Sequence, residues 1–180
     1  MKSLVVYSSL TGNTKKIAEA VCHVMPDCRI VPVEDAPTDL ESYGLIAVGW
    51  WASKGAPDAK TREWLKGVKN CRLVFFGTLG AKPDSDHAKD CMAQAERSAL
   101  EPARGNIVCG SWMCQGKIDP KIIEVMRKLD LEVHRELLHD PSRLEEAASH
   151  PDDCDCRKAQ AFMQGLLAGL EHSPCPQSRA

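Results

Sequence analysis

The hydrophobic residues of the chain gather in five short, dense runs that are separated by longer segments of mixed polarity. The strands that these runs predict are Leu4–Tyr7, Arg29–Val33, Leu45–Val48, Leu73–Phe76 and Ile107–Val108, the last extending to about Trp112. The first, third and fourth runs are continuously apolar and do not alternate with polar residues. Continuous runs are typical of parallel strands that are covered on both faces of a sheet.

Between the predicted strands, apolar residues recur at the spacing of amphipathic helices. The helices predicted in this part of the chain are Thr14–Met25, Asp58–Val68 and Ser85–Leu100. The connection between the second and third strands, EDAPTDLESYG, is short and polar and has room for a brief helix at most. Regular alternation of strands and helices predicts an α/β fold with a doubly wound parallel sheet.

The pattern changes after Trp112, beyond which no further strand is predicted. One helix is predicted to begin at Asp119 and to run to about Leu129, and a final helix to cover about Asp153–Leu170. Pro151 and the two aspartates after it are a start signal, because acidic side chains favour the positive end of a helix. The sequence therefore predicts an extra, mainly helical segment between the last strand and the last helix.

Length and charge narrow the possible classes of protein. The chain has 180 residues, the size of one domain. We expect this domain over residues 1–172 and a disordered tail over residues 173–180, where two prolines occur without apolar periodicity. The formal net charge of −2 argues against nucleic-acid binding. Because the apolar runs are too short for a secretory signal or a membrane span, we expect a cytoplasmic protein with no membrane insertion.

Nine cysteines are many for a chain of this length, and their number is odd. Without a recognisable secretory signal, they are expected to be reduced thiols and not a disulfide framework. Cys154 and Cys156 lie near His150 in the sequence, but a fourth ligand for a tetrahedral metal site is not evident. The sequence thus predicts no metal centre, and it singles out no catalytic acid or base.

The segment SSLTGNT, residues 8–14, separates the first predicted strand from the first predicted helix. In an open α/β sheet, ligands bind outside the carboxyl ends of the strands. The start of a helix offers unpaired backbone N–H groups and the positive end of the helix dipole, both of which suit a phosphate. Side chains of Ser9, Thr11, Asn13 and Thr14 add donors, and Gly12 allows a close approach of the backbone. The segment therefore predicts a phosphate site.

Two other phosphate motifs are missing from the sequence. The segment SSLTGNT lacks the lysine of the Gly-x-x-x-x-Gly-Lys-Ser/Thr loop, which argues against hydrolysis of nucleoside triphosphates. The Gly-x-Gly-x-x-Gly fingerprint of dinucleotide-binding proteins occurs nowhere in the chain.

The segment SLTGNTKKIAEAV resembles the phosphate-binding loop of the flavodoxin family, Ser/Thr-x-Thr-Gly-x-Thr after the first strand. The resemblance implies a flavodoxin-like fold, whose five-stranded parallel sheet has the order 2-1-3-4-5. It also implies FMN as the cofactor. The residues that would hold its 5′-phosphate are Ser9, Leu10, Thr11, Gly12, Asn13 and Thr14.

The same resemblance implies that the loops after the third and fourth strands enclose the isoalloxazine ring. One side of the ring would be lined by Trp51, Ala52, Ser53, Lys54 and Gly55, and the other by Thr78, Leu79, Gly80 and Ala81. Neighbouring strand residues point to opposite faces, so one of Trp50 and Trp51 belongs to the core, and we expect Trp51 near the ring. A flip of the Gly55 peptide would offer a carbonyl to the flavin N5 and stabilise the one-electron-reduced cofactor.

Three features depart from typical flavodoxins: the loop after the fourth strand has no tyrosine, the chain is less acidic, and an extra segment follows Trp112. The segments GTLGAKPDSDHA, CQGKIDP and HPDD resemble a bacterial flavodoxin-like subgroup, some of whose members accompany reductases, including bilirubin-reducing ones. Two roles are open for residues 114–117 of the second segment. They would contact the flavin or a docked partner, or they would have only a structural capping role after the last strand.

The expected function is FMN-dependent electron transfer to a redox partner protein. Two alternatives remain at this point, an NAD(P)H-dependent quinone or flavin reductase and a protein-docking module that binds no flavin. The oligomeric state stays open.

Overall fold

The computed structural model describes residues 1–129, 138 and 140–172. The strands are β1 (Ser3–Tyr7), β2 (Cys28–Pro32), β3 (Leu45–Ser53), β4 (Ala56–Pro57), β5 (Arg72–Leu79) and β6 (Ile107–Gln115). The helices are α1 (Asn13–Val24), α2 (Ala59–Leu65), α3 (Asp86–Ala99), α4 (Pro120–Leu129), α6 (Pro141–Ala148) and α7 (Asp153–His172), with short 3₁₀ turns at Val33–Asp35 and Pro102–Arg104. The tail predicted over residues 173–180 lies outside the described residues.

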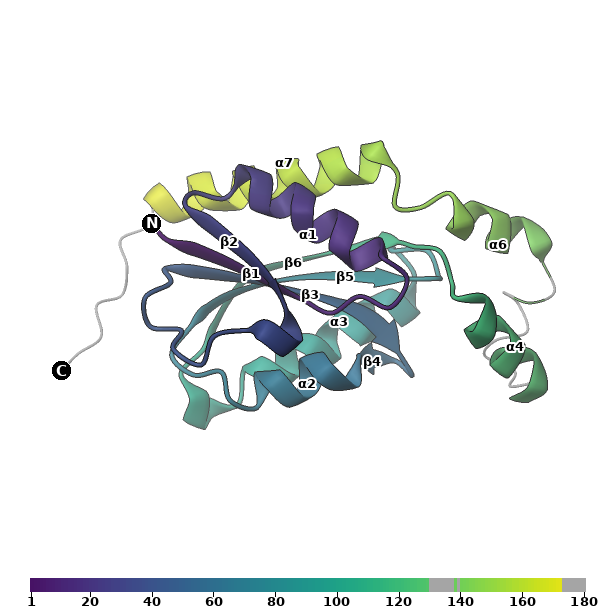
Figure 1. The fold of residues 1–180 in the computed structure, drawn as a ribbon, viewed down its shortest axis with the longest axis horizontal. Coiled ribbons are helices and arrows are strands. Elements are labelled where there is room, and N and C mark those ends of the chain that lie inside the picture. Colours follow the sequence, from purple (N-terminus) through teal and green to yellow (C-terminus); the bar gives the residue numbers. More distant parts are fainter. Residues whose placement is uncertain (130–137, 139, 173–180) are drawn as a thin grey trace.

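Five parallel strands form the body of the sheet in the order β2-β1-β3-β5-β6. Helices α1 and α7 cover one face of the sheet, and α2 and α3 cover the other (Figure 1). The predicted doubly wound α/β fold is thereby confirmed, and the five parallel strands follow one another in the predicted order. The sheet has one strand more than predicted, because β4 pairs with β3 in antiparallel orientation.

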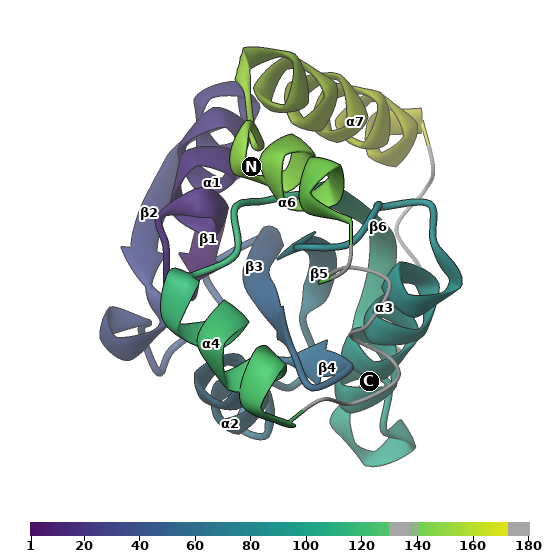
Figure 2. The same cartoon turned by 90° about the vertical axis from the view of Figure 1, so that its right-hand side faces the viewer.

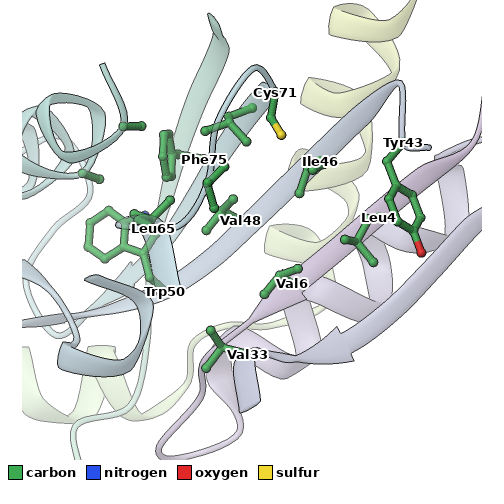
Figure 3. Close-up of a cluster of buried hydrophobic side chains, with 14 of the residues drawn as sticks. Leu4, Val6, Val33, Tyr43, Ile46, Val48, Trp50, Leu65, Cys71 and Phe75 are labelled. Carbon is green, nitrogen blue, oxygen red and sulfur yellow. The ribbon is translucent and has the colours of Figure 1, made fainter. Parts of the chain in front are cut away.

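The strands in the middle of the sheet are buried on both faces, as their apolar runs predict. Leu4 and Val6 of β1 point into the cluster beneath α2 and α3, together with Phe75 of β5 (Figure 3). Val5 and Phe76 belong to the opposite cluster, beneath α1 and α7. Because successive side chains of a strand point to opposite faces, both faces stay apolar only when every position is apolar.

Several boundaries differ from the predicted ones. Helix α2 ends at Leu65, three residues earlier than predicted, and α7 continues two residues further, to His172. Helix α6 was not predicted as a separate element. No helix in the described ranges is both long enough and apolar enough to cross a membrane.

The expectation of reduced thiols is wrong for one pair of cysteines. Cys22 of α1 and Cys28 of β2 form a disulfide, with their Cα atoms 5.7 Å apart. The chain turns back tightly between α1 and β2, so this turn brings two cysteines six positions apart to a separation that a disulfide can bridge. Six other cysteines among the described residues are free thiols.

A buried carboxylate joins the end of β1 to the start of α2. Asp58 is 2% exposed and caps α2, since its side chain accepts the backbone N–H groups of Lys60 and Thr61 at 3.1 and 3.2 Å. It also accepts the hydroxyl groups of Ser8 at 2.9 Å and of Thr61 at 2.8 Å. One side chain therefore fixes the position of the β1–α1 loop relative to a helix fifty residues later.

We expect Asp58→Ala to lower the free energy of unfolding by about 3 kcal/mol, because a helix cap is lost and a buried hydroxyl is left without an acceptor. Urea denaturation followed by circular dichroism measures this change. The control is Ser85→Ala, which removes the cap of α3 at a half-buried position and should cost about 1 kcal/mol. Equal losses in the two variants would contradict the bridging role of Asp58.

Candidate functional site

The loops that follow β1, β3, β5 and β6 converge beyond the carboxyl ends of the strands, on the side that faces the viewer in Figure 2. They surround a cavity of about 830 Å³. The predicted site residues that line it are Leu10, Thr11, Asn13, Trp51, Ala52, Lys54, Gly55, Thr78, Leu79, Gly80 and Ala81. The other predicted residues, Ser9, Gly12, Thr14 and Ser53, belong to the same loops without lining the cavity.

One end of the cavity lies against the start of α1. Gly12 precedes the helix with φ of 90°, a left-handed conformation that favours glycine. Ser9 Oγ accepts the N–H groups of Gly12 at 3.1 Å and Lys15 at 3.3 Å. Within the described part of the chain, the N–H groups of Asn13 and Thr14 have no hydrogen-bond acceptor. These two donors at the positive end of a helix suit an anion.

The two lysines after the loop are turned away from its donors. Lys15 lies 3.9 Å from Glu19 of the same helix. Lys16 Nζ donates to the carbonyl oxygen of Pro151 at 2.9 Å and lies 3.4 Å from Asp153. Lys15 and Lys16 are therefore engaged outside the loop, and the lysine that lines the cavity next to Asn13 is Lys117.

Thr14 fastens the first loop to the sheet. Its side chain is buried, and its hydroxyl lies 2.9 Å from the hydroxyl of Thr78 on β5. Thr14 Oγ1 is thus engaged within the protein and supports the loop from the side of the sheet.

A β-hairpin forms one wall of the cavity. The two-residue turn between β3 and β4 consists of Lys54 and Gly55, both with positive φ, 54° and 77°. Such two-residue turns match the twist of the strands that they connect. The segment SKGA contains the glycine that signals this turn, but β4 has only two residues and no pattern of its own.

The two adjacent tryptophans of β3 point to opposite sides. Trp50 is fully buried in the cluster beneath α2 and α3, whereas Trp51 lines the cavity. Trp50 is therefore the core residue of the pair and Trp51 is the one at the cavity, and the position of Trp51 near a flavin ring stays a prediction. Its indole offers an apolar surface suited to stacking on a flat ring.

Two helices that were not predicted to reach the site form its outer wall. Apolar side chains line the cavity here, namely Ile118, two residues before α4, and Ile122 and Met126 of α4. Their spacing of four residues is the signal in the sequence that one helix face is apolar. Arg143 and Glu146 of α6 also line the cavity, and Glu146 lies 4.0 Å from Lys82. The segment after β6 therefore covers the cavity.

The segment that follows β6 divides between cavity and core. Gln115, Gly116 and Lys117 line the cavity, and Gln115 Nε2 donates to the carbonyl oxygen of Gly80 at 3.2 Å. Cys114 is 2% exposed and packs beneath α1 and α7, where burial raises the pKa of its thiol well above the usual range. Of the residues 114–117, the last three reach the ligand cavity and Cys114 does not.

The described residues contain one cluster of potential metal ligands, His150, Asp152 and Asp155. Asp152 Oδ1 accepts the N–H of Asp155 at 2.8 Å, and Asp155 Oδ2 accepts the N–H of Asp152 at 3.0 Å. This reciprocal arrangement is a capping box at the start of α7, and the N–H of Asp155 lowers the pKa of the Asp152 carboxyl. The cluster is thus explained by helix capping.

A doubly wound sheet with an anion-binding first turn and an aromatic wall at its carboxyl edge defines a class of α/β proteins that bind phosphorylated ring cofactors. Within this class the chain belongs to the flavodoxin domain family, whose model matches residues 4–164. The family resemblance of the first loop is thereby confirmed.

The chain is similar to several known proteins. It is 33% identical over 176 residues to the flavodoxin-like domain-containing protein BilS of Clostridioides difficile strain CD3, covering 93% of this chain and 97% of that one. Oxidised flavodoxin 2 from Bacillus cereus has a similar fold, with a TM-score of 0.60, 14% identity, and coverage of 94% and 99%. A flavoprotein from Lactobacillus acidophilus NCFM, solved in complex with FMN, has a TM-score of 0.52, 20% identity, and coverage of 62% and 92%.

We expect Cys114 to resist alkylation by iodoacetamide at pH 8.5 in the folded protein, since its thiol is buried and protonated at that pH. Cys154 is exposed and should react within minutes. Peptide mass spectrometry measures both residues in one sample, and the same reaction in urea shows that Cys114 can be labelled once unfolded. Rapid labelling of Cys114 in the folded protein would contradict its assignment to the core.

Proposed function

We propose that the protein binds FMN in the cavity at the carboxyl edge of the sheet and carries electrons to a partner protein. The observation that carries the proposal is that one cavity joins the free N–H donors of the α1 start to a wall formed by Trp51. Membership of the flavodoxin domain family supports it, as does the complex of the Lactobacillus acidophilus flavoprotein with FMN.

The residues at the two ends of the cavity fit the two ends of FMN. The 5′-phosphate is assigned to the β1–α1 loop, where the N–H groups of Asn13 and Thr14 lack acceptors among the described residues and Thr11 adds a hydroxyl. The ring is assigned to the space between Trp51 and the segment from Thr78 to Ala81. When bound, FMN supplies the electron chemistry, and the chain holds it, orients it and shields it from water.

Helix α4 contributes to this shielding. Its first turns face the cavity with Ile122 and Met126, which follow Ile118 at helical spacing. When a ring covers apolar side chains that line an open cavity, their surface is removed from water, and this burial favours binding. The wall is therefore suited to the apolar edge of a flavin.

A protein partner is the proposed source or acceptor of the electrons. The chain lacks the Gly-x-Gly-x-x-Gly fingerprint for a nicotinamide dinucleotide, which favours a carrier over a self-sufficient NAD(P)H-dependent quinone or flavin reductase. Stopped-flow mixing of the FMN-loaded protein with NADPH or NADH separates the two. A carrier leaves the nucleotide unoxidised, and rapid bleaching of the flavin would favour the reductase.

We expect the wild-type protein to bind FMN in a one-to-one ratio with quenching of flavin fluorescence. Trp51→Ala should weaken this binding about tenfold, because stacking on an aromatic side chain contributes about 1–3 kcal/mol. Trp64→Ala is the control, since it removes a tryptophan of α2 that does not line the cavity. Absence of FMN binding at micromolar concentration would overturn the proposed function and leave the protein-docking module as the alternative.

We expect Gly55→Ala to destabilise the one-electron-reduced flavin, which lowers the midpoint potential for the first electron and raises that for the second. Gly55 has a φ of 77°, which alanine adopts at a cost of about 1–2 kcal/mol, while a Cβ there meets no atom within 4 Å. The shift for a one-electron couple is about 60 mV for each tenfold change in stability. Spectroelectrochemical titration measures both potentials, with Gly165→Ala on α7 as an unstrained control. Unchanged potentials would exclude a role for the Gly55 peptide.

A further inference from the structure

The segment HPDD, residues 150–153, forms a turn between α6 and α7 that also contacts the loops around the cavity; we call it the HPDD turn. The carbonyl oxygen of His150 accepts the N–H of Lys117 at 3.0 Å. The carbonyl oxygen of Pro151 accepts Lys16 Nζ at 2.9 Å. The turn thus contacts both the segment after β6 and helix α1, while none of its four residues lines the cavity.

A second hydrogen bond continues from the HPDD turn to the phosphate end of the cavity. The carbonyl oxygen of Lys117 accepts Nδ2 of Asn13 at 2.8 Å. Asn13 is the first residue of α1, and its backbone N–H has no acceptor among the residues that the structure describes. Gly116 makes room for this contact, because a Cβ at that position would lie 2.6 Å from Asn13 Nδ2. The backbone of Lys117 therefore links the HPDD turn to the loop, with its N–H bonded to His150 and its carbonyl to Asn13.

The position of His150 is itself fixed by a buried carboxylate. His150 Nδ1 lies 2.5 Å from Oδ2 of Asp155, which is 6% exposed. The same oxygen accepts the N–H of Asp152 in the capping box of α7. Asp155 therefore contacts both the start of α7 and the His150 side chain. The backbone carbonyl of His150 in turn accepts the N–H of Lys117, whose own carbonyl holds Asn13.

We propose that His150 and Asp155 are positioning residues for the phosphate of the flavin: they hold the HPDD turn so that Lys117 fixes Asn13 and the N–H groups of the β1–α1 loop point into the cavity. The proposal rests on the proposed binding of FMN. Neither side chain touches the ligand cavity, so the pair acts through Lys117. Preorganised donors bind an anion more tightly, because the loop loses less conformational entropy when the ligand arrives. The pair should therefore set the preference for FMN over riboflavin, which has the same ring without the phosphate.

The test compares dissociation constants for FMN and riboflavin, measured by fluorescence quenching. His150→Ala should weaken FMN binding about tenfold and riboflavin binding less than about twofold. His150→Asn should restore most of the FMN affinity, because its amide reaches the position of Nδ1. Asp155→Ala should resemble His150→Ala. Asp152→Ala is the matched control, since it removes the other side chain of the capping box and leaves the contact of His150 with Asp155.

A second measurement follows the loop without ligand. The N–H groups of Gly12 and Lys15 donate to Ser9 within the loop, so their hydrogen exchange reports whether it is held in place. His150→Ala should speed their exchange about tenfold relative to the N–H of Ala88, which donates to Ser85 at the start of α3. Equal losses of FMN and riboflavin affinity, or unchanged exchange, would overturn the positioning role. If the wild type binds no FMN, the proposed function fails, and exchange still decides whether the HPDD turn holds the loop.

Discussion

Burial of the central strands on both faces is the constraint on which the rest of this structure depends. A strand such as β3, apolar from Leu45 to Val48, needs helices above and below it. Parallel strands in turn require a crossover connection each time the chain returns to the sheet. All the strands of the parallel set therefore end at one edge, and the loops that follow them meet there. The place of the cavity therefore follows from the burial of apolar side chains in the sheet and does not depend on which residues form the site.

Local patterns in the sequence carried most of the fold and part of the site. The continuous runs in β1, β3 and β5 predicted buried parallel strands, and SSLTGNT predicted the helix start that lies at one end of the cavity. Alternation along a strand predicted that one of Trp50 and Trp51 is buried in the core, without deciding which. These features depend on residues that are neighbours in the chain. Strand β4 was missed because two residues are too few to show periodicity, and it is recognised as a strand only by its pairing with β3.

Contacts between distant parts of the chain could not be predicted in this way. The pairing of Cys22 with Cys28 depends on how tightly α1 turns into β2, which the spacing of cysteines alone does not specify. The outer wall of the cavity depends on where α4 and α6 lie after β6. Helical periodicity predicts which face of a helix is apolar, but it does not predict which part of the protein that face contacts. The bond from Asn13 to the peptide of Lys117 spans 104 positions. Its acceptor is a backbone carbonyl, which every residue has, so no residue type marks it in the sequence.

The donors that the first loop offers to an anion are local in the sequence, whereas the residues that hold these donors in place are distant. The two lysines that follow the first loop, Lys15 and Lys16, are engaged with Glu19 and with the HPDD turn, so within the loop itself the donors for an anion are uncharged. Dipoles hold an anion only when they are fixed in direction, because they carry no net charge that would attract it from a distance. A loop of this kind depends on rigid support more than a lysine-based loop does. That support comes from Asp58 beneath the loop, Thr78 beside it and Lys117 across from it, three residues that lie far from the loop in sequence.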